Sequence, residues 1–296
     1  MRTKMASRKI IRRGFIDNSC SVYKVAKERT PITWESVFEG ADLELKDISN
    51  MLEKDEKENG RFVPNKKDIF AAFEKTKLLD VSVVIFGQEP YTDMININGK
   101  IVPKDVGMAY SVRKGDNVPP VLKSIYKELY NSIENFVVPE HGDLSKWASQ
   151  GVLLLNACLT INPKKECKTL HPKSCIWMDF VTAVIKSIVS VNPQTIFVLW
   201  GRENQKLTTM LGDRSVVLTA AYPTCKVGFL GCDHFNEINI ELEKQGKNPI
   251  NWNLVEPVVD YVPFNTKCSD EYKKKSEQEK VESTDIVKLV PFSNIN

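Results

Sequence analysis

The polar side chains best placed to do chemistry follow directly on a short apolar stretch. Gln88, Glu89 and Tyr91 come after residues 81–86, a run rich in β-branched side chains that stops at Gly87. Such a run is typical of a buried parallel strand that ends in a turn. In open α/β sheets, ligands bind in the crevice beyond the carboxyl ends of the strands. The amide, carboxylate and phenol therefore belong either to a ligand site or to an ordinary polar surface loop.

Three further apolar runs indicate that this turn lies at the edge of a larger sheet. They span residues 151–155, 195–200 and 215–219, and helix-sized intervals separate them. This alternation predicts an α/β fold of three layers, α/β/α, with a central four-stranded, mainly parallel sheet. Parallel strands bring their carboxyl ends to one edge, where Asn156, Tyr222 and Thr224 would join Gln88 and Glu89. That convergence favours a ligand site.

The segments between the strands form the scaffold. Apolar side chains at helical spacing predict helices over residues 34–57, 122–130 and 177–191. Residues 107–112 resemble a short strand with Tyr110 near its end, and residues 93–105 are expected to form a loop. Pro119 and Pro120 form a stiff, extended element before the second helix.

Composition and length exclude several classes of protein. The chain has 296 residues and a net charge of +3, which neither proves nor opposes a nucleic-acid partner. No apolar stretch approaches the ~20 residues that a membrane-spanning helix needs, so we expect no membrane association. The seven cysteines are dispersed without CxxC spacing, which predicts reduced thiols and neither a disulfide framework nor a zinc site. With no metal-ligand cluster and no phosphate-binding Gly-rich loop, we expect no cofactor and no metal.

Shifts in composition divide the chain into three parts. Residues 1–30 are basic, with no acidic residue before Asp17, and are predicted to form a flexible arm. This arm could be a plain tail, a contact for nucleic acid, a nuclear address or a mitochondrial transit segment. Residues 31–256 form the predicted domain, and residues 257–296 are a polar extension with a run of charges. Either terminal segment could hold a protein partner.

Several motifs of this domain resemble those of a known family. They are Gly-Gln-Glu-Pro-Tyr at 87–91, Ile-Tyr-Lys-Glu-Leu at 125–129, His-Gly-Asp-Leu-Ser-Lys-Trp at 141–147, Gly-Val-Leu-Leu-Leu-Asn at 151–156, and Phe-Leu-Gly-Cys-Asp-His-Phe at 229–235. These motifs are similar to those of family-1 uracil-DNA glycosylases, and they occur in the same order and at nearly the same spacing. That family hydrolyses the bond between uracil and deoxyribose after the base is extruded from the stack. The resemblance covers residues 31–256 and implies uracil-containing DNA, single- or double-stranded, as the partner.

The resemblance implies a uracil pocket. Gln88 would hold a uracil carbonyl, and Asn156 would pair with the base edge, because an amide offers both a donor and an acceptor. Tyr91 would stand beside C5 of uracil and exclude the methyl group of thymine. Tyr110 takes the place of the family's stacking phenylalanine, and a phenol ring stacks nearly as well.

The catalytic pair implied by the resemblance departs from the family pattern. Glu89 stands where the family has an aspartate that steadies the cation-like sugar and orients water. The added methylene shifts the carboxylate, and a misplacement of about 1 Å can cost ~10²-fold in rate. Tyr222 stands where the family has a histidine that donates a hydrogen bond to the developing uracil oxyanion. A phenol can also donate that bond.

Other departures gather on the expected DNA-facing edge. The resemblance places DNA contacts at Pro119, Pro120, Arg202, Thr224 and Lys226. Arg202 replaces a serine of the family and could still meet a phosphate. The segment after Tyr222 is shorter than in the family, so the leucine that wedges into the duplex has no counterpart.

Two functions remain open from the sequence. The first is a cofactor-independent hydrolase of base excision repair that removes uracil from DNA, with attenuated activity. The alternative is a catalytically inactive scaffold that keeps the fold for DNA binding or as a replication accessory subunit. We expect an intracellular monomer, in the nucleus or another DNA-replication compartment, or in mitochondria if the Arg-rich N-terminus is a transit segment.

Overall fold

A parallel sheet organises the domain. The computed structural model of the chain describes residues 19–164 and 175–255. Strands β1 (Val83–Gly87), β4 (Val152–Asn156), β5 (Ile196–Trp200) and β6 (Val216–Ala220) form one sheet in the order β4-β1-β5-β6. All three strand pairings are parallel, which confirms the predicted four-stranded sheet.

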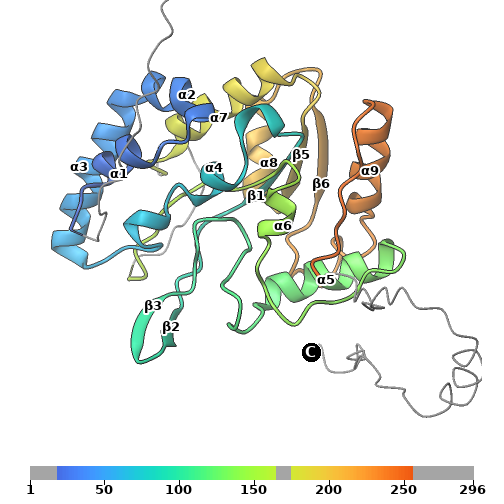
Figure 1. The fold of residues 1–296 in the computed structure, drawn as a ribbon, viewed down its shortest axis with the longest axis horizontal. Helices are drawn as coiled ribbons and strands as arrows, with labels where there is room; N and C mark the ends of the chain where they lie inside the picture. The colour runs from blue at the N-terminus through green and yellow to red at the C-terminus, as the bar shows by residue number, and fades with distance from the viewer. Residues whose placement is uncertain (1–18, 165–174, 256–296) are drawn as a thin grey trace, which may run out of the picture. The chain divides into compact units, whose positions relative to one another are not determined.

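Helices cover both faces of this sheet and give the three predicted layers. Figure 1 shows α2 (Glu35–Gly40), α3 (Asp42–Asn59) and α7 (Met178–Val191) on one side, with α5 (Pro120–Ser132) and α9 (His234–Lys244) on the other. Strands β1, β4 and β5 are buried along their whole length, because a parallel sheet packed on both faces has no wet side. No helix in the described ranges is long and apolar enough to cross a membrane.

Several short helices connect these elements. They are α4 (Ala71–Lys75), α6 (Ser145–Ala148), α8 (Arg202–Gln205) and the 3₁₀ turns η1 (Ile32–Trp34), η2 (Lys66–Asp68), η3 (Leu78–Asp80) and η4 (Lys206–Met210). The predicted helices over 122–130 and 177–191 are confirmed by α5 and α7. The predicted helix over 34–57 is instead two helices, which meet at Ala41.

Helix α1 (Val22–Arg29) corrects the boundary predicted at residue 30. Val22, Val25 and Ala26 are buried in the domain core, and α1 packs against α3. Their spacing follows one face of a helix, so this segment gains stability by burying apolar area and belongs to the domain. Residues 1–18 of the predicted arm, and the extension 257–296, lie outside the described residues.

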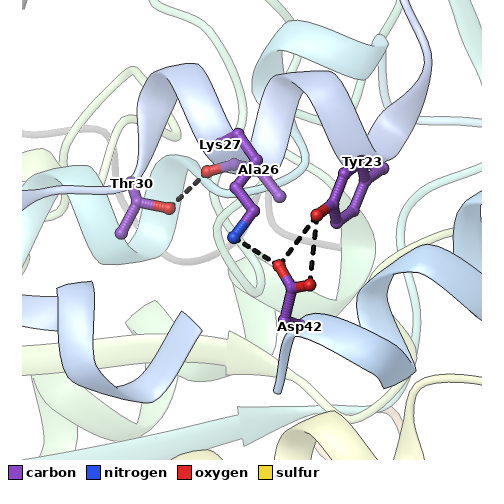
Figure 2. Close-up of polar contacts among 5 residues, drawn as sticks. All are labelled: Tyr23, Ala26, Lys27, Thr30 and Asp42. Carbon is purple, nitrogen blue, oxygen red and sulfur yellow. Dashed lines mark hydrogen bonds and ion pairs between the residues drawn. The ribbon is translucent and has the colours of Figure 1, made fainter. Parts of the chain in front are cut away.

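Polar contacts reinforce the docking of α1. The Tyr23 hydroxyl donates to both carboxylate oxygens of Asp42, at 2.9 and 3.1 Å (Figure 2). Lys27 forms an ion pair with the same carboxylate, and the Thr30 hydroxyl donates to the carbonyl of Ala26 at the end of the helix. One side chain at the start of α3 therefore holds two side chains of α1.

The segment after β1 differs from the prediction in two ways. Residues 93–105, expected as a loop, contain a hairpin of β2 (Met94–Ile97) and β3 (Lys100–Pro103). Its turn places Asn98 and Gly99 at φ +50° and +80°. Asn-Gly is the dipeptide that favours such hairpin turns, so the sequence does carry a local signal for this hairpin. Residues 107–112, expected as a strand, form a turn, because Tyr110 has φ +65°, which no strand accommodates.

The cysteines are not all reduced. Cys158 and Cys175 form a disulfide across 17 residues of sequence. The prediction of reduced thiols was wrong here because the fold brings together two cysteines that lack a recognisable spacing in the sequence. Cys20, Cys225 and Cys232 are free thiols, and Cys167 and Cys268 lie outside the described residues.

Candidate active site

One cavity gathers the six residues predicted to bind and cleave. It has a volume of about 220 Å³ and lies where β1 and β4 end. Its walls include Gln88, Glu89, Tyr91, Tyr110, Asn156 and Tyr222. Four chain segments supply them, and parallel strands account for their meeting at one edge of the sheet.

The floor of the cavity depends on a close approach between β1 and β4. Gly87 lies opposite Asn156 in the strand register. A Cβ atom on Gly87 would stand 2.1 Å from Oδ1 of Asn156, so only glycine leaves room for this buried amide. The N–H groups of Ala157 and Cys158 donate to the carbonyls of Gly87 and Gln88, at 2.9 and 3.0 Å. The two amides of the cavity are thus fixed relative to each other.

Two tyrosines form a hydrogen-bonded wall. The Tyr91 hydroxyl donates to the Tyr110 carbonyl at 3.1 Å, and the Tyr110 hydroxyl donates to the Phe86 carbonyl at 3.0 Å. The Tyr110 ring lies 5.7 Å from that of Trp200. Burial raises the pKa of both phenols well above the usual value, so both are neutral near pH 7. These hydrogen bonds fix the positions of the two rings in the cavity wall.

Asp105 anchors the Tyr91 wall, a role that no pattern in the sequence indicates. Its carboxylate is 1% exposed and accepts hydrogen bonds from the backbone N–H of Tyr91 at 3.0 Å and of Gly107 at 2.7 Å. Burial raises the pKa of Asp105 to about 7, against the opposing effect of these two bonds. The Asp105 side chain thereby connects the two ends of the segment 91–105, which contains the β2–β3 hairpin.

Tyr222 and Glu89 face the same cavity. The Tyr222 ring is half-buried, and its hydroxyl pKa is raised, first by burial and then by the negative charge of Glu89. Near neutral pH the phenol therefore keeps its proton. A neutral donor and a carboxylate in one small cavity can stabilise charges of opposite sign.

A second hollow opens beside the first. It has a volume of about 560 Å³, shares Gln88 and Tyr222 with the first cavity, and is also lined by Arg202 and Val227. The Val227 side chain is 84% exposed. The predicted DNA contact Arg202 thus lines a hollow that adjoins the base cavity.

The other expected DNA contacts lie outside these two walls. Thr224 and Lys226 are exposed on the loop after Tyr222, and neither lines the two hollows. Pro120 is exposed as the first residue of α5, whereas Pro119 before it is buried. Between these prolines and the helix body, Val121 reaches the cavity wall.

Two buried polar side chains that we did not predict tie neighbouring elements of the domain together. The Glu128 carboxylate accepts hydrogen bonds from the N–H groups of Gly231 at 2.6 Å and Asp233 at 2.9 Å, which ties α5 to the loop before α9. The Asn204 amide donates to the carbonyls of Phe86 at 2.9 Å and Trp200 at 3.2 Å, which joins the ends of β1 and β5. Glu128 lies in the motif Ile-Tyr-Lys-Glu-Leu at residues 125–129, where it is the one acidic residue.

Metal ligation has no candidate in the described ranges 19–164 and 175–255, where no group of three or more His, Cys, Asp or Glu is found. His234 is buried, and its Nδ1 accepts a hydrogen bond from the Trp200 indole at 3.0 Å. Burial lowers the pKa of His234 to about 4, so this histidine is neutral.

Comparisons with known proteins agree with this geometry. Residues 73–244 match the family model described as the uracil DNA glycosylase superfamily. The chain is 39% identical to a uracil-DNA glycosylase of Vibrio parahaemolyticus over 75% of its length and 96% of that protein. It is 41% identical to one of Dichelobacter nodosus, over 64% of this chain and 80% of that protein. The crystal structure of mimivirus uracil-DNA glycosylase superposes with a TM-score of 0.68 at 25% identity, covering 78% of this chain and 89% of that one. The sequence match, the fold and the cavity at the sheet edge agree, and the chain belongs to the uracil-DNA glycosylase superfamily.

Proposed function

We propose that this protein is a uracil-DNA glycosylase, a cofactor-independent hydrolase of base excision repair that acts on DNA. The observation that carries the proposal is the cavity of about 220 Å³ in which all six predicted residues meet. Its place beyond the carboxyl ends of β1 and β4 is where open α/β sheets bind ligands.

The base enters this cavity after extrusion from the stack. The buried Asn156 amide accepts a hydrogen bond from uracil N3–H and donates one to the neighbouring carbonyl, and Gln88 holds the other side of the ring. Cytosine offers a different pattern of donors and acceptors, so it is rejected. Tyr91, tied to the Tyr110 carbonyl, leaves no room for the methyl group of thymine, while the Tyr110 ring provides a stacking surface.

Hydrolysis breaks the bond between uracil N1 and C1′ of the sugar. The bonding electrons leave with the base, and Tyr222 donates a hydrogen bond to the oxyanion that develops on it. Glu89 stabilises the positive charge on the sugar and orients the water that adds to C1′. The proton of that water passes by way of Glu89 to solvent, and the uracil anion takes up a proton in turn.

The DNA grip and the chain ends complete the proposal. Pro119, Pro120, Arg202, Thr224 and Lys226 contact the DNA strand around the extruded nucleotide, on a protein that acts as a monomer. Arg202 is supported by its exposed position on the hollow that adjoins the cavity. We retain a protein partner for the terminal extensions, and a nuclear or mitochondrial address for the N-terminus, as proposals on segments outside the described residues.

The experiment is an excision assay on single- and double-stranded DNA that carries one uracil. Tyr222→Phe removes the proton donor and keeps the ring, so we expect kcat to fall about 10²–10³-fold. Tyr130→Phe, at an exposed tyrosine of α5, is the matched control and should retain full activity. Asn156→Ala should abolish excision, and free uracil should protect the wild-type protein but not this variant against thermal unfolding.

Two outcomes would contradict the proposal. If the wild-type protein binds DNA and excises no uracil, it is a non-catalytic DNA-binding scaffold. If excision persists in Asn156→Ala and in Glu89→Ala, the chemistry lies elsewhere in the chain.

A further inference from the structure

A large cleft lies apart from the base cavity, between the end of α3 and the β2–β3 hairpin. Its volume is about 550 Å³. Residues 59–63 at the end of α3 form one wall, Met94 and residues 101–103 of the hairpin form the other, and Lys164 adds to the rim. None of its lining residues belongs to the base cavity.

One wall of this cleft is positively charged. Arg61, Lys67 and Lys164 are exposed, and no ion pair within the described residues involves them. Lys66, the fourth basic residue, is buried and paired at 2.8 Å with Glu56, the only acidic residue among the described residues that line the cleft. Because that pair neutralises itself, the cleft presents three cationic side chains with no ion-pair partner in the described ranges 19–164 and 175–255.

The opposite wall is apolar, and two of its side chains are exposed. The hairpin register pairs Met94 with Pro103 and Asn96 with Ile101, so three apolar side chains and the Asn96 amide project from one face. Met94, Ile101 and Pro103 of this face line the cleft. Pro103 is buried, whereas Met94 is 50% and Ile101 is 65% exposed. A pocket with cations on one side and flat apolar surface on the other matches a nucleotide, which combines an anionic phosphate with the apolar face of a base.

The backbone connects this cleft to the base cavity directly. Thr92 lines the base cavity and Met94 lines the cleft, two residues further on. Extended chain covers at most about 7 Å over two residues. A stacked DNA strand advances about 3.4 Å per nucleotide, so the strand that leaves the base cavity reaches the cleft within a few nucleotides.

We propose that this cleft is a second binding site for DNA, occupied by the strand that flanks the extruded nucleotide. Arg61, Lys67 and Lys164 bind its phosphates, and a base lies on Met94 and Ile101. The proposal rests on the proposed function, because it takes its occupant from the base cavity. Charge complementarity and continuity with that cavity favour DNA over an acidic protein segment.

The test compares two triple variants that lose the same charge. One is Arg61→Ala/Lys67→Ala/Lys164→Ala, and the control is Lys46→Ala/Lys75→Ala/Lys186→Ala, at exposed lysines of α3, α4 and α7. Binding to a long single-stranded oligonucleotide without uracil is measured against salt concentration. Each lost phosphate contact reduces the slope of log K against log salt by about 0.7, so the cleft variant should lose about 2 from the slope. Its affinity should fall at least about tenfold, and the control should match the wild type.

Two further measurements separate the parts of the proposal. Ile101→Ser should weaken binding several-fold with an unchanged salt slope, because it removes apolar surface and no charge. Excision at saturating DNA concentration should keep the wild-type kcat in the cleft variant, because the cleft binds flanking DNA and does not touch the bond that breaks.

Equal affinity and slope in the cleft variant and the control would overturn the proposal, as expected if the cleft holds an acidic protein segment. That result with normal uracil excision would leave the proposed function intact. Wild-type protein that binds long DNA through the cleft but excises no uracil would refute the function alone.

Discussion

The base cavity and the cleft beside the β2–β3 hairpin, here called the hairpin cleft, differ in size and in the chemistry of the side chains that line them. The base cavity is small. Its lining includes the amides of Gln88 and Asn156 and three phenols, and two of these phenols donate hydrogen bonds to backbone carbonyls. Its acidic lining residues are Glu89 and Asp93. The cleft is more than twice as large, and exposed cationic and apolar side chains line it. The first selects by shape and donor pattern, whereas the second attracts by charge. Changes in the cavity should therefore alter rate or specificity at any salt concentration, and changes in the cleft should alter salt-dependent affinity.

The strongest way to break this contrast is Gly87→Ala. The new Cβ would stand 2.1 Å from Oδ1 of Asn156, far inside van der Waals contact, so the amide must move by about 1 Å. Displacement of about 1 Å can cost 10²-fold, and we expect kcat/KM to fall at least that far at low and high salt alike. Gly40→Ala, where a Cβ meets nothing within 4 Å, is the control. An active Gly87→Ala enzyme would show that Asn156 does not read the base.

Asp105→Asn tests whether the buried acid behind the cavity wall has a raised pKa. The pKa of Asp105 in the folded protein is about 7, above its ordinary value of 3.8, so the folded state binds the proton more tightly than the unfolded state. This group therefore stabilises fully below about pH 4, and that contribution is lost as the pH rises towards 7. Its slope is about −1.4 kcal/mol per pH unit in that window.

His234 contributes the opposite slope in almost the same window. Its pKa falls from 6.5 to about 4 on folding, so its contribution is present above pH 6.5 and is lost as the pH falls towards 4. The two groups nearly cancel in the wild-type protein. Asp105→Asn should expose the His234 slope, and urea unfolding between pH 4.5 and 6.5 measures it. Parallel curves for the two proteins would show that Asp105 is not a buried acid with a raised pKa.

The smallest expected effect is that of Tyr91→Phe. It removes the hydrogen bond to the Tyr110 carbonyl, worth about 1 kcal/mol, and keeps the ring that blocks the thymine methyl group. We expect a change in excision of only a few-fold, with thymine still rejected. Tyr91→Ala should instead admit thymine. Competition between uracil- and thymine-containing DNA distinguishes the two, and rejection of thymine by Tyr91→Ala would move the selectivity to another residue.

Much of the fold and the cavity could be predicted from sequence for a definite reason. The four apolar runs must be buried, and parallel strands leave their polar successors at one edge, so Gln88, Asn156 and Tyr222 had to meet. The prediction failed where local signals were weak or misjudged. Helix α1 directly follows a basic N-terminal segment, and the two were grouped together as one flexible arm. The Asn98-Gly99 turn lies in a polar stretch that was interpreted as a loop.

The sequence by itself determined the sheet, the order of its motifs and the residues at the strand ends, because burial and periodicity are local properties of the chain. Only the tertiary structure decided the partners of the buried polar groups. Asp105 meets the Tyr91 N–H, Glu128 meets the loop before α9, and Cys158 meets Cys175. Such pairs join residues that no sequence pattern connects, and the hairpin cleft arises in the same way from segments far apart in the chain. Which polar atoms share a buried space depends on how the layers pack, and that is settled only when the whole domain folds.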